Sequence, residues 1–279
     1  MVITQYTDNE FLTRLLAPVP SYAQKRKEKL GYRDYPIDAE SAVYNEPLVN
    51  IADYGVAGQS YWSRPNSLLG APLPNVTQAI LVRESVAKKL QQANKIIMSQ
   101  QLAKLFGCEV EIYVDNGIRT PELQVYLYNV AYPKHIAKQN PKWNSERVLR
   151  RRDELIAKPP QNTSNPSPHM TGAAVDLTLR LKQSNKGYVE NVGIELLRAS
   201  GATNESCNPD YAEYSPRPAY ISEELWQEGT RNRRIMYNVL THCGMQVNPT
   251  ELWHYSWGDQ MWAKLHGKPA ALYGTAPSI

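Results

Sequence analysis

The amino-acid sequence predicts an α+β fold in which a central antiparallel sheet is flanked by helices. Two segments alternate apolar and polar residues as strands do, CEVEIYVDNG at 108–117 and AAVDLTLR at 173–180. Other segments repeat apolar residues at helical spacing, most clearly 77–106 and 232–243. The 279 residues are enough to bury a large core.

The first half of the chain divides into an extension and the start of a main domain. Residues 1–44 are mixed in character and contain the charged cluster AQKRKEK, so we expect an N-terminal extension wrapped on the surface of a domain spanning 45–279. A short strand is expected within 45–54. The pattern at 77–106 predicts one or two helices ending at Gly107.

The strand at 108–117 is expected to be buried on one face only, because Cys108, Val110, Ile112 and Val114 share that face. The next element is a helix.

Thr120 can cap this helix and Pro121 suits its first position, so the sequence predicts a helix from there to about Asn129. A second short helix is expected over 145–157. The segment 158–168 contains four prolines among polar turn formers, which excludes regular structure.

The last third begins with a long polar region, 181–220, which follows the second alternating segment. The helix at 232–243 is expected to end at Gly244, a suitable residue for the left-handed turn after a helix. ELWHYSWG at 251–258 predicts a strand and DQMWAKLH at 259–266 a final helix.

Charge and composition exclude several classes of partner. The 31 Lys and Arg against 27 Asp and Glu give a net charge of +4, too small to indicate a nucleic-acid partner without a basic stripe. The arginines of 147–152 are interrupted by acidic residues and are typical of a solvated helix face. No apolar run is long enough to span a membrane, so no membrane partner is expected.

The cysteines and the N-terminus indicate a cytoplasmic protein. Cys108, Cys207 and Cys243 are odd in number and lack the CxxC spacing, which argues against a disulfide framework and against a cysteine zinc site. The first residues lack the basic and apolar regions of a signal peptide. If a signal peptide had been removed, the location would be periplasmic or secreted.

Asp176 is the unusual residue of the second alternating segment, since it is a carboxylate among small and β-branched residues. Alternation places it on the polar face of a strand whose other face is core. His169 precedes the strand, and Gly172 between them permits a tight turn, so His169 could fold back toward the same face. Imidazole nitrogen and carboxylate oxygen are ligands that zinc accepts.

Glu251 and His254 offer a third ligand and a base. Their spacing of three would separate them in a regular strand, but Pro249 and Thr250 place Glu251 at the entering turn, free to point into a cleft beside His254. With His169, Asp176 and His254 as ligands, zinc keeps an open position, which is the arrangement of a catalytic site. A Glu beside such a site can take the proton of a water molecule.

Less specific interpretations exist for each of these residues. An isolated His is more often structural than a ligand, and His135, His242 and His266 have no partner pattern, so we assign them no role in the site. Asp176 alone could pair with Arg180 on the same strand face. Both motifs together, in this order, favour a zinc site on the sheet.

At these residues the sequence resembles the zinc D-alanyl-D-alanine peptidases, including the dipeptidases of the vancomycin-resistance type. The family signature SxHxxGxAxD is matched by Ser167, His169, Gly172, Ala174 and Asp176. TELWHYSWGDQMWA from Thr250 onward resembles the family's later element, and NRRIMYNVLTHCGM resembles the helix before it. The resemblance spans about 45–265, in order.

The resemblance implies one Zn²⁺ per chain on His169, Asp176 and His254, with Glu251 as general base and later acid. It also implies that Arg119, in the run NGIRT, stabilises the oxyanion, and that Ser167 lies near a small peptide substrate.

The sequence also departs from the family pattern. In the NGIRT run, Asn116 stands where the family has Asp. The polar region after Asp176 replaces a short family segment that helps to enclose the dipeptide.

The leading hypothesis is hydrolysis of a short D-amino-acid peptide, most simply D-Ala-D-Ala, by a zinc metallopeptidase. One alternative within the enzyme class is a D,D-carboxypeptidase or another hydrolase of cell-wall (peptidoglycan) peptides. A second alternative is a zinc-stabilised binding module without catalysis, against which the presence of both Glu251 and Arg119 argues. Oligomeric state is not predicted.

Overall fold

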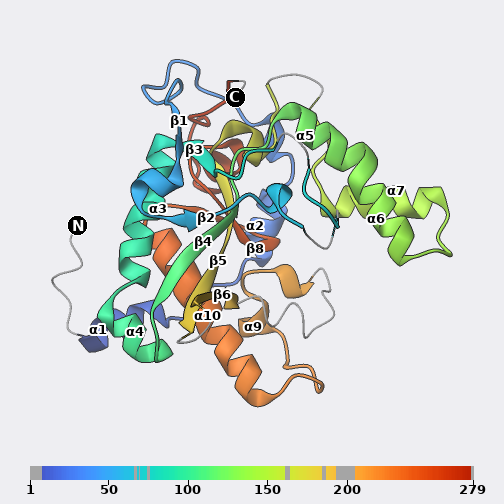
Figure 1. Ribbon diagram of the computed structural model, residues 1–279. Helices are drawn as coiled ribbons and strands as arrows, with labels where there is room; N and C mark the ends of the chain where they lie inside the picture. Colours follow the sequence, from blue (N-terminus) through green and yellow to red (C-terminus); the bar gives the residue numbers. More distant parts are fainter. Residues whose placement is uncertain are drawn as a thin grey trace.

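A mixed sheet forms the centre of the molecule (Figure 1). The computed structural model describes residues 8–65, 68, 70–73, 76–160, 164–183, 187–192 and 205–277. Within the polar region 181–220, residues 184–186 and 193–204 therefore lie outside the described residues. The strands of the six-stranded sheet follow the order β2 (Ala57–Gly58), β4 (Val110–Asn116), β5 (Ala174–Gln183), β8 (Glu251–Ser256) and β7 (Gln246–Asn248), and β6 (Gly187–Val192) pairs with β5.

The predicted α+β class is confirmed, but the sheet is not purely antiparallel. The pairs β4–β5, β5–β6, β5–β8 and β7–β8 are antiparallel, whereas β2 runs parallel to β4. The chain between β2 and β4 contains β3 (Leu81–Arg83), α3 (Glu84–Ile97) and α4 (Gln100–Phe106), a connection long enough to return to the same end of the sheet. A small antiparallel pair, β1 (Leu48–Asn50) with β3, lies beside it.

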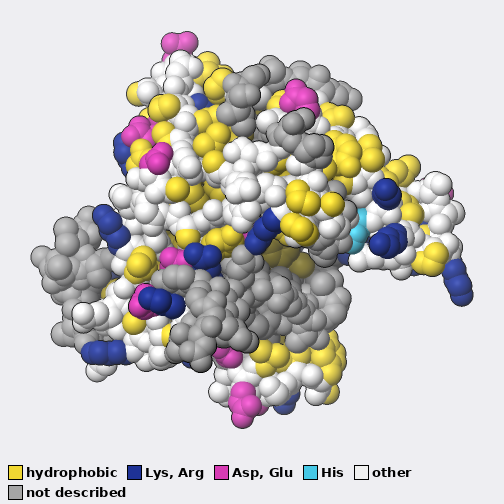
Figure 2. All heavy atoms as spheres, viewed as in Figure 1, with side chains coloured by type: hydrophobic (Ala, Val, Ile, Leu, Met, Phe, Trp, Pro, Cys, Tyr) yellow, Lys and Arg dark blue, Asp and Glu magenta, His cyan; other side chains and the backbone are white. Residues whose placement is uncertain are grey.

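Helices lie on both sides of the sheet (Figure 1). The remaining α-helices are α1 (Asp8–Leu15), α2 (Ala23–Glu28), α5 (Pro121–Tyr126), α6 (Tyr132–Gln139), α7 (Ser145–Leu155), α9 (Tyr211–Tyr214), α10 (Glu223–His242) and α11 (Gln260–Leu265). Helices α6 and α7 project as an arm on which Lys and Arg side chains gather (Figure 2). Among the described residues, no helix is both long and apolar enough to cross a bilayer.

The main core lies between the sheet and the helices α3 and α10. Val175, Leu177 and Leu179 of β5 are buried there, as the alternation predicts, against apolar residues of both helices. Burying a side chain of this size contributes about 1.5–3 kcal/mol. The core therefore fixes which face of β5 is left for Asp176.

The prediction that the strand at 108–117 is buried on one face only is wrong, since β4 is buried on both. Arg180 of the neighbouring strand covers its polar face, forming an ion pair with Glu111 and lying 4.3 Å from the ring centroid of Tyr113. Because Arg180 pairs with Glu111, the alternative pairing of Asp176 with Arg180 is not seen.

Most of the predicted helices and turns are confirmed, with different bounds. The pattern at 77–106 gives two helices, α3 and α4, preceded by the strand β3. Thr120 caps α5 by accepting a hydrogen bond from the N–H of Leu123, and the helix continues through a π-helical turn into α6. Helix α10 begins earlier than predicted, at Glu223, and Gly244 follows it with φ of 84°.

The N-terminal segment is part of the main core. Phe11, Val19 and Tyr22 are buried in the same cluster as the sheet residues, and Arg26 forms a 2.8 Å ion pair with Asp210. The sequence predicted an extension on the surface, but the segment also contributes side chains to the core. The domain boundary at residue 45 stays a prediction.

Candidate metal centre

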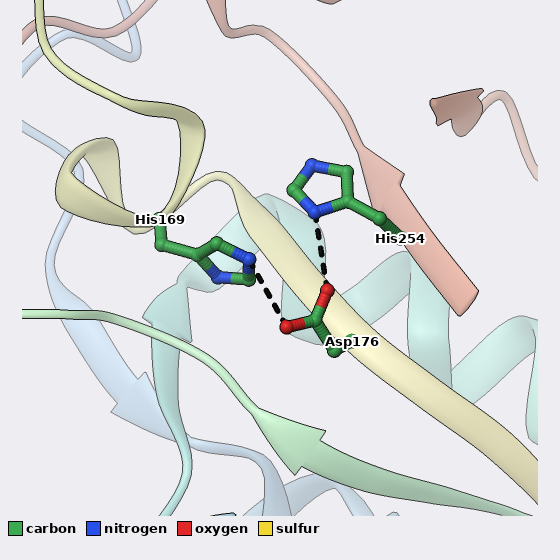
Figure 3. Close-up of side chains that lie close together, drawn as sticks. All are labelled: His169, Asp176 and His254. Atoms are coloured by element: carbon green, nitrogen blue, oxygen red, sulfur yellow. Dashed lines mark hydrogen bonds and ion pairs between the residues drawn. The ribbon is translucent and has the colours of Figure 1, made fainter. Parts of the chain in front are cut away.

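Three side chains from two strands and a turn converge on the polar face of the sheet (Figure 3). Asp176 of β5 and His254 of β8 are directly paired across the antiparallel ladder, so their side chains share a face. His169 lies in the 3-10 turn Pro168–Thr171 just before β5. Gly172 ends this turn with φ of 71°, a conformation that favours glycine, and a Cβ atom there would lie 2.6 Å from Leu48 Cδ2 and displace that side chain.

The donor atoms of these three residues, which we call the His-Asp-His cluster, all lie within 4.8 Å of one another. His169 Nε2 is 3.2 Å from Asp176 Oδ2, and His254 Nδ1 is 3.1 Å from Asp176 Oδ1. Ligands at about 2.0–2.2 Å from a tetrahedral zinc ion are about 3.3–3.6 Å from one another. The cluster therefore has ligand types that zinc accepts and His–Asp spacings close to those of tetrahedral ligands, while its longest donor separation, up to 4.8 Å, would shorten when zinc binds.

Hydrogen bonds behind the cluster fix the orientation of two of its members. His169 Nδ1 lies 2.9 Å from the Gly117 carbonyl, which can only accept, so Nδ1 carries the proton and Nε2 is left as the donor atom for a metal. Asn116 Nδ2 donates to Asp176 Oδ2 at 3.0 Å, and Trp62 Nε1 donates to Asn116 Oδ1 at 3.2 Å. The amide of Asn116 thus has a single orientation, with its N–H groups toward the carboxylate.

Burial and charge act on the cluster in opposite directions. Burial disfavours the imidazolium of His169 and lowers its pKa, with a further contribution from the positive charge of Arg119. Burial also acts on His254, but the hydrogen bond and charge of Asp176 outweigh it and raise the pKa of His254. For Asp176, the two histidines outweigh burial and hold the pKa of the carboxyl well below its usual range, so it is ionised at neutral pH.

The cluster is accessible from one side. Asp176 keeps 21% of its side-chain surface exposed, whereas the two histidines are buried. A cavity of about 390 Å³, which we call the cluster cavity, opens onto all three residues. Its volume lies in the range of sites for small ligands.

Glu251 lies beside the cluster in this cavity. Its Oε2 is 3.8 Å from His254 Nδ1 although both residues belong to β8. The register between β7 and β8 shifts here, so that Asn248 pairs with Glu251 directly after Val247 pairs with Tyr255. This irregularity lets two residues three apart face the same side, where a regular strand would separate them.

Arg119 also lines the cluster cavity and is largely buried. Its guanidinium donates to Gln124 Oε1 at 2.9 Å and lies 5.5 Å from the ring centroid of Trp62. Its backbone N–H donates to the His169 carbonyl at 3.0 Å. The positive charge is therefore held rigidly at the edge of the cluster.

Ser167 is buried at the start of the turn that carries His169 and lines the cluster cavity. Its backbone carbonyl accepts a hydrogen bond from the N–H of Met170 at 2.9 Å, so the residue also supports the turn. A contact of Ser167 with substrate stays a prediction.

A second cavity of about 420 Å³ meets the cluster cavity. The two share Arg119, Tyr132, Leu155, Asp176 and Trp253. Burial raises the pKa of Tyr132 to about 12, against the effect of the nearby Arg119 charge, so its phenol is neutral and can donate a hydrogen bond. His135, to which the sequence assigned no role, lines the second cavity.

Sequence analysis did not identify the residues that surround the cluster from distant parts of the chain. Lys29, Tyr32 and Arg33 of the N-terminal segment line the cluster cavity, as does Asn248. No motif marks the first three, because their role depends on packing between segments more than a hundred residues apart. Asn248 lies three residues before Glu251, and this proximity in the sequence is the one signal that could have indicated its place in the cavity wall.

Comparisons with known proteins agree with the two motifs. No family model matches the chain. A D-alanyl-D-alanine dipeptidase from Synechocystis sp. is 25% identical over 224 residues, which cover 78% of this chain and 84% of that protein.

Similar solved structures include the vancomycin-resistance D,D-pentapeptidase VanY in complex with Zn(II). Its sequence is 16% identical, the match covers 85% of this chain and 90% of that chain, and the TM-score is 0.35. The LD-carboxypeptidase LdcB has 15% identity, 74% and 72% coverage, and a TM-score of 0.28. In its sequence, the chain is therefore similar to a D-alanyl-D-alanine dipeptidase.

Proposed function

We propose that the protein is a zinc-dependent hydrolase of short peptides that contain D-amino acids, with D-Ala-D-Ala as the leading substrate. The observation that carries the proposal is the His-Asp-His cluster with Glu251 and Arg119 beside it in one cavity. The relative from Synechocystis sp., a D-alanyl-D-alanine dipeptidase, supports the choice of substrate class.

His169, Asp176 and His254 would hold one zinc ion per chain on the sheet. Two neutral imidazoles and one carboxylate leave one charge of the ion uncompensated and a coordination position open, as in catalytic sites. When bound, zinc supplies Lewis-acid chemistry, making water more acidic and polarising a carbonyl group.

Glu251 would act as general base and then as general acid. Its carboxylate lies beside the cluster, 3.8 Å from His254, and can take a proton from water as the water attacks the peptide carbonyl. The same carboxyl group would then give the proton to the leaving amine. One residue can perform both steps because the proton it takes from water is the proton that the leaving amine needs.

Arg119 would stabilise the negative charge that develops on the carbonyl oxygen. Its guanidinium is fixed by Gln124 and by the ring of Trp62, so little reorganisation is needed when the charge forms. Ser167 would contact the peptide near the cluster. The phenol of Tyr132, which lines both cavities together with Arg119 and Asp176, would bind the peptide as well.

A second candidate is a D,D-carboxypeptidase acting on longer cell-wall peptides. The observation that favours it is the second cavity, which continues from the cluster cavity past Trp253 and offers room beyond a dipeptide. Hydrolysis of free D-Ala-D-Ala can be compared with hydrolysis of a pentapeptide stem. A dipeptidase would cleave only the former, whereas a carboxypeptidase would release D-Ala from the latter.

The experiment that tests the proposal is a panel of D,D-, L,D- and L,L-dipeptides, with metal content measured on the same sample. We expect about one zinc per chain and turnover that requires a D-residue. Zinc binding without hydrolysis of any D-amino-acid peptide, including the stem, would instead identify a zinc-stabilised binding module.

A further inference from the structure

The N-terminal segment places one cation next to the proposed catalytic carboxylate. Lys29 directly follows α2 and lines the cluster cavity together with Glu251. Helix α2 is held in place by the ion pair of Arg26 with Asp210 and by Tyr22, which is buried in the main core. The position of Lys29 is therefore set by the packing of the whole segment.

The ammonium group of Lys29 is bound to two residues of the turn that leads to Glu251. Its Nζ donates to Asn248 Oδ1 at 2.8 Å and to Thr250 Oγ1 at 2.9 Å. Burial lowers the pKa of Lys29, while the negative charge of Glu251 acts in the opposite direction and favours the ammonium form. Lys29 is half-buried, and its hydrogen bonds to these two partners fix its ammonium group in the cavity wall.

Asn248 connects Lys29 to Glu251. An ammonium group can only donate, so the side of the Asn248 amide that faces Lys29 must be the oxygen. The backbone N–H of Thr250 also donates to this oxygen, at 3.2 Å. The amide nitrogen is therefore turned the other way, where it donates to Glu251 Oε2 at 2.8 Å.

We propose that Lys29 is a positioning residue that acts through Asn248 to hold the Glu251 carboxylate facing the His-Asp-His cluster. The chain of contacts runs from Nζ to the amide oxygen and from the amide nitrogen to Oε2, the oxygen that lies 3.8 Å from His254. The inference rests on the proposed function insofar as Glu251 is the general base. Its structural part, control of the carboxylate position, stands independently.

Loss of the ammonium group weakens this control. In Lys29→Met the side-chain oxygen of Asn248 keeps only its hydrogen bonds from Thr250. The Asn248 amide is then less firmly held, and when it rotates by 180° its oxygen faces and repels the Glu251 carboxylate. The carboxylate then occupies several orientations, of which a fraction faces the cluster. Substitution of a residue that orients a group at a metal site typically lowers activity 10- to 100-fold.

The test compares three variants with the wild-type protein on D-Ala-D-Ala. Lys29→Met is expected to lower kcat about tenfold with KM and zinc content unchanged. Lys29→Arg, which can still donate to both Asn248 and Thr250, is expected to restore part of kcat. The matched control is Lys25→Met, because Lys25 lies one turn earlier and contacts Gln246 Oε1 at 3.3 Å, away from Glu251, so its kcat should not change.

Kinetics in a second background separate positioning from general damage. If Lys29 acts through Glu251, Lys29→Met should cause no further loss of residual turnover in a Glu251→Ala protein. An equal loss in both backgrounds would overturn the proposal. So would a raised KM with unchanged kcat, which would indicate that Lys29 contacts the substrate directly.

A crystal structure of zinc-loaded Lys29→Met gives a readout that does not depend on turnover. We expect the Glu251 carboxylate to be displaced from His254 or spread over several conformers. An unchanged, well-ordered carboxylate would overturn the proposal even if the true substrate were another peptide. Failure of the wild-type protein on every D-amino-acid peptide would reject the proposed function, while this structure would still decide the role of Lys29.

Discussion

The two walls of the cluster cavity are supplied by the chain in different ways. The sheet wall consists of the turn at Pro168–Thr171 with β5 and β8, and carries His169, Asp176, Glu251 and His254. The remaining wall, which we call the helical wall, combines Lys29 and Tyr32 with Arg119 and Tyr132. The first set lies in two short motifs. In the second set the run NGIRT marks Arg119, whereas no motif marks Lys29, Tyr32 or Tyr132.

The difference shows how the tasks of the site are divided. The residues proposed to hold one small ion lie on two paired strands and on the turn that enters one of them, and this rigid frame fixes their spacing in the sequence. Residues that surround a peptide need only reach the cavity from some element. Substitutions on the two walls should therefore have effects that differ in magnitude and in the property that changes.

The largest effect is expected on the sheet wall, from Glu251→Ala. Removing the proposed general base should lower kcat by about 10³-fold or more while zinc stays bound, since Glu251 is not among the three proposed ligands. Turnover and metal content measured together check this. An active Glu251→Ala protein would show that proton transfer lies elsewhere.

On the helical wall, Arg119→Lys should lower kcat/KM about 100-fold without loss of zinc. A single ammonium group cannot keep the hydrogen bond to Gln124 and also face the cavity as the guanidinium does. Arg152→Lys is the matched control, because Arg152 stacks on Tyr128 at 3.8 Å but lines neither cavity. Equal losses in the two variants would mean that stacking on the ring, and not charge at the cluster, explains the effect of Arg119.

A smaller effect is expected from the residue behind the sheet wall. Asn116→Ala removes the 3.0 Å hydrogen bond that orients Asp176, and zinc affinity should fall about 10- to 100-fold. Competition with a chromophoric chelator measures this affinity. If it is unchanged, the strand alone is sufficient to orient Asp176.

The smallest effect should come from the packing that supports the helical wall. Tyr22→Phe keeps the buried ring but loses the hydroxyl contacts with Tyr237 at 3.2 Å and Gln246 at 3.4 Å. We expect the free energy of unfolding to fall by about 1 kcal/mol, measured by urea denaturation. A separate early unfolding transition would show that the N-terminal segment is only loosely attached to the core.

The parts of this molecule that the sequence could predict are those governed by local patterns. Alternation around Asp176 gave both β5 and the face on which that residue lies, and the turn allowed by Gly172 brings His169 to it. Thr120 and Gly244 marked a helix start and a helix end in the same way.

Features that depend on distant partners were not accessible from the sequence. The parallel pairing of β2 with β4 is made by only two residues of β2, too few for a pattern. Burial of both faces of β4 depends on Arg180 lying over Tyr113, which no property of β4 itself indicates. The contact of Lys29 with Asn248 joins segments 219 residues apart.

The hydrogen bonds between the loop at 117–119 and the turn that carries His169 have a consequence for protein engineering. His169 Nδ1 donates to the Gly117 carbonyl at 2.9 Å, and the His169 carbonyl accepts from the N–H of Arg119 at 3.0 Å. The loop and the turn therefore hold each other in register. To transplant this site onto another sheet, both segments must be moved together. The histidine motif alone would lack the Gly117 carbonyl, which sets the tautomer of His169.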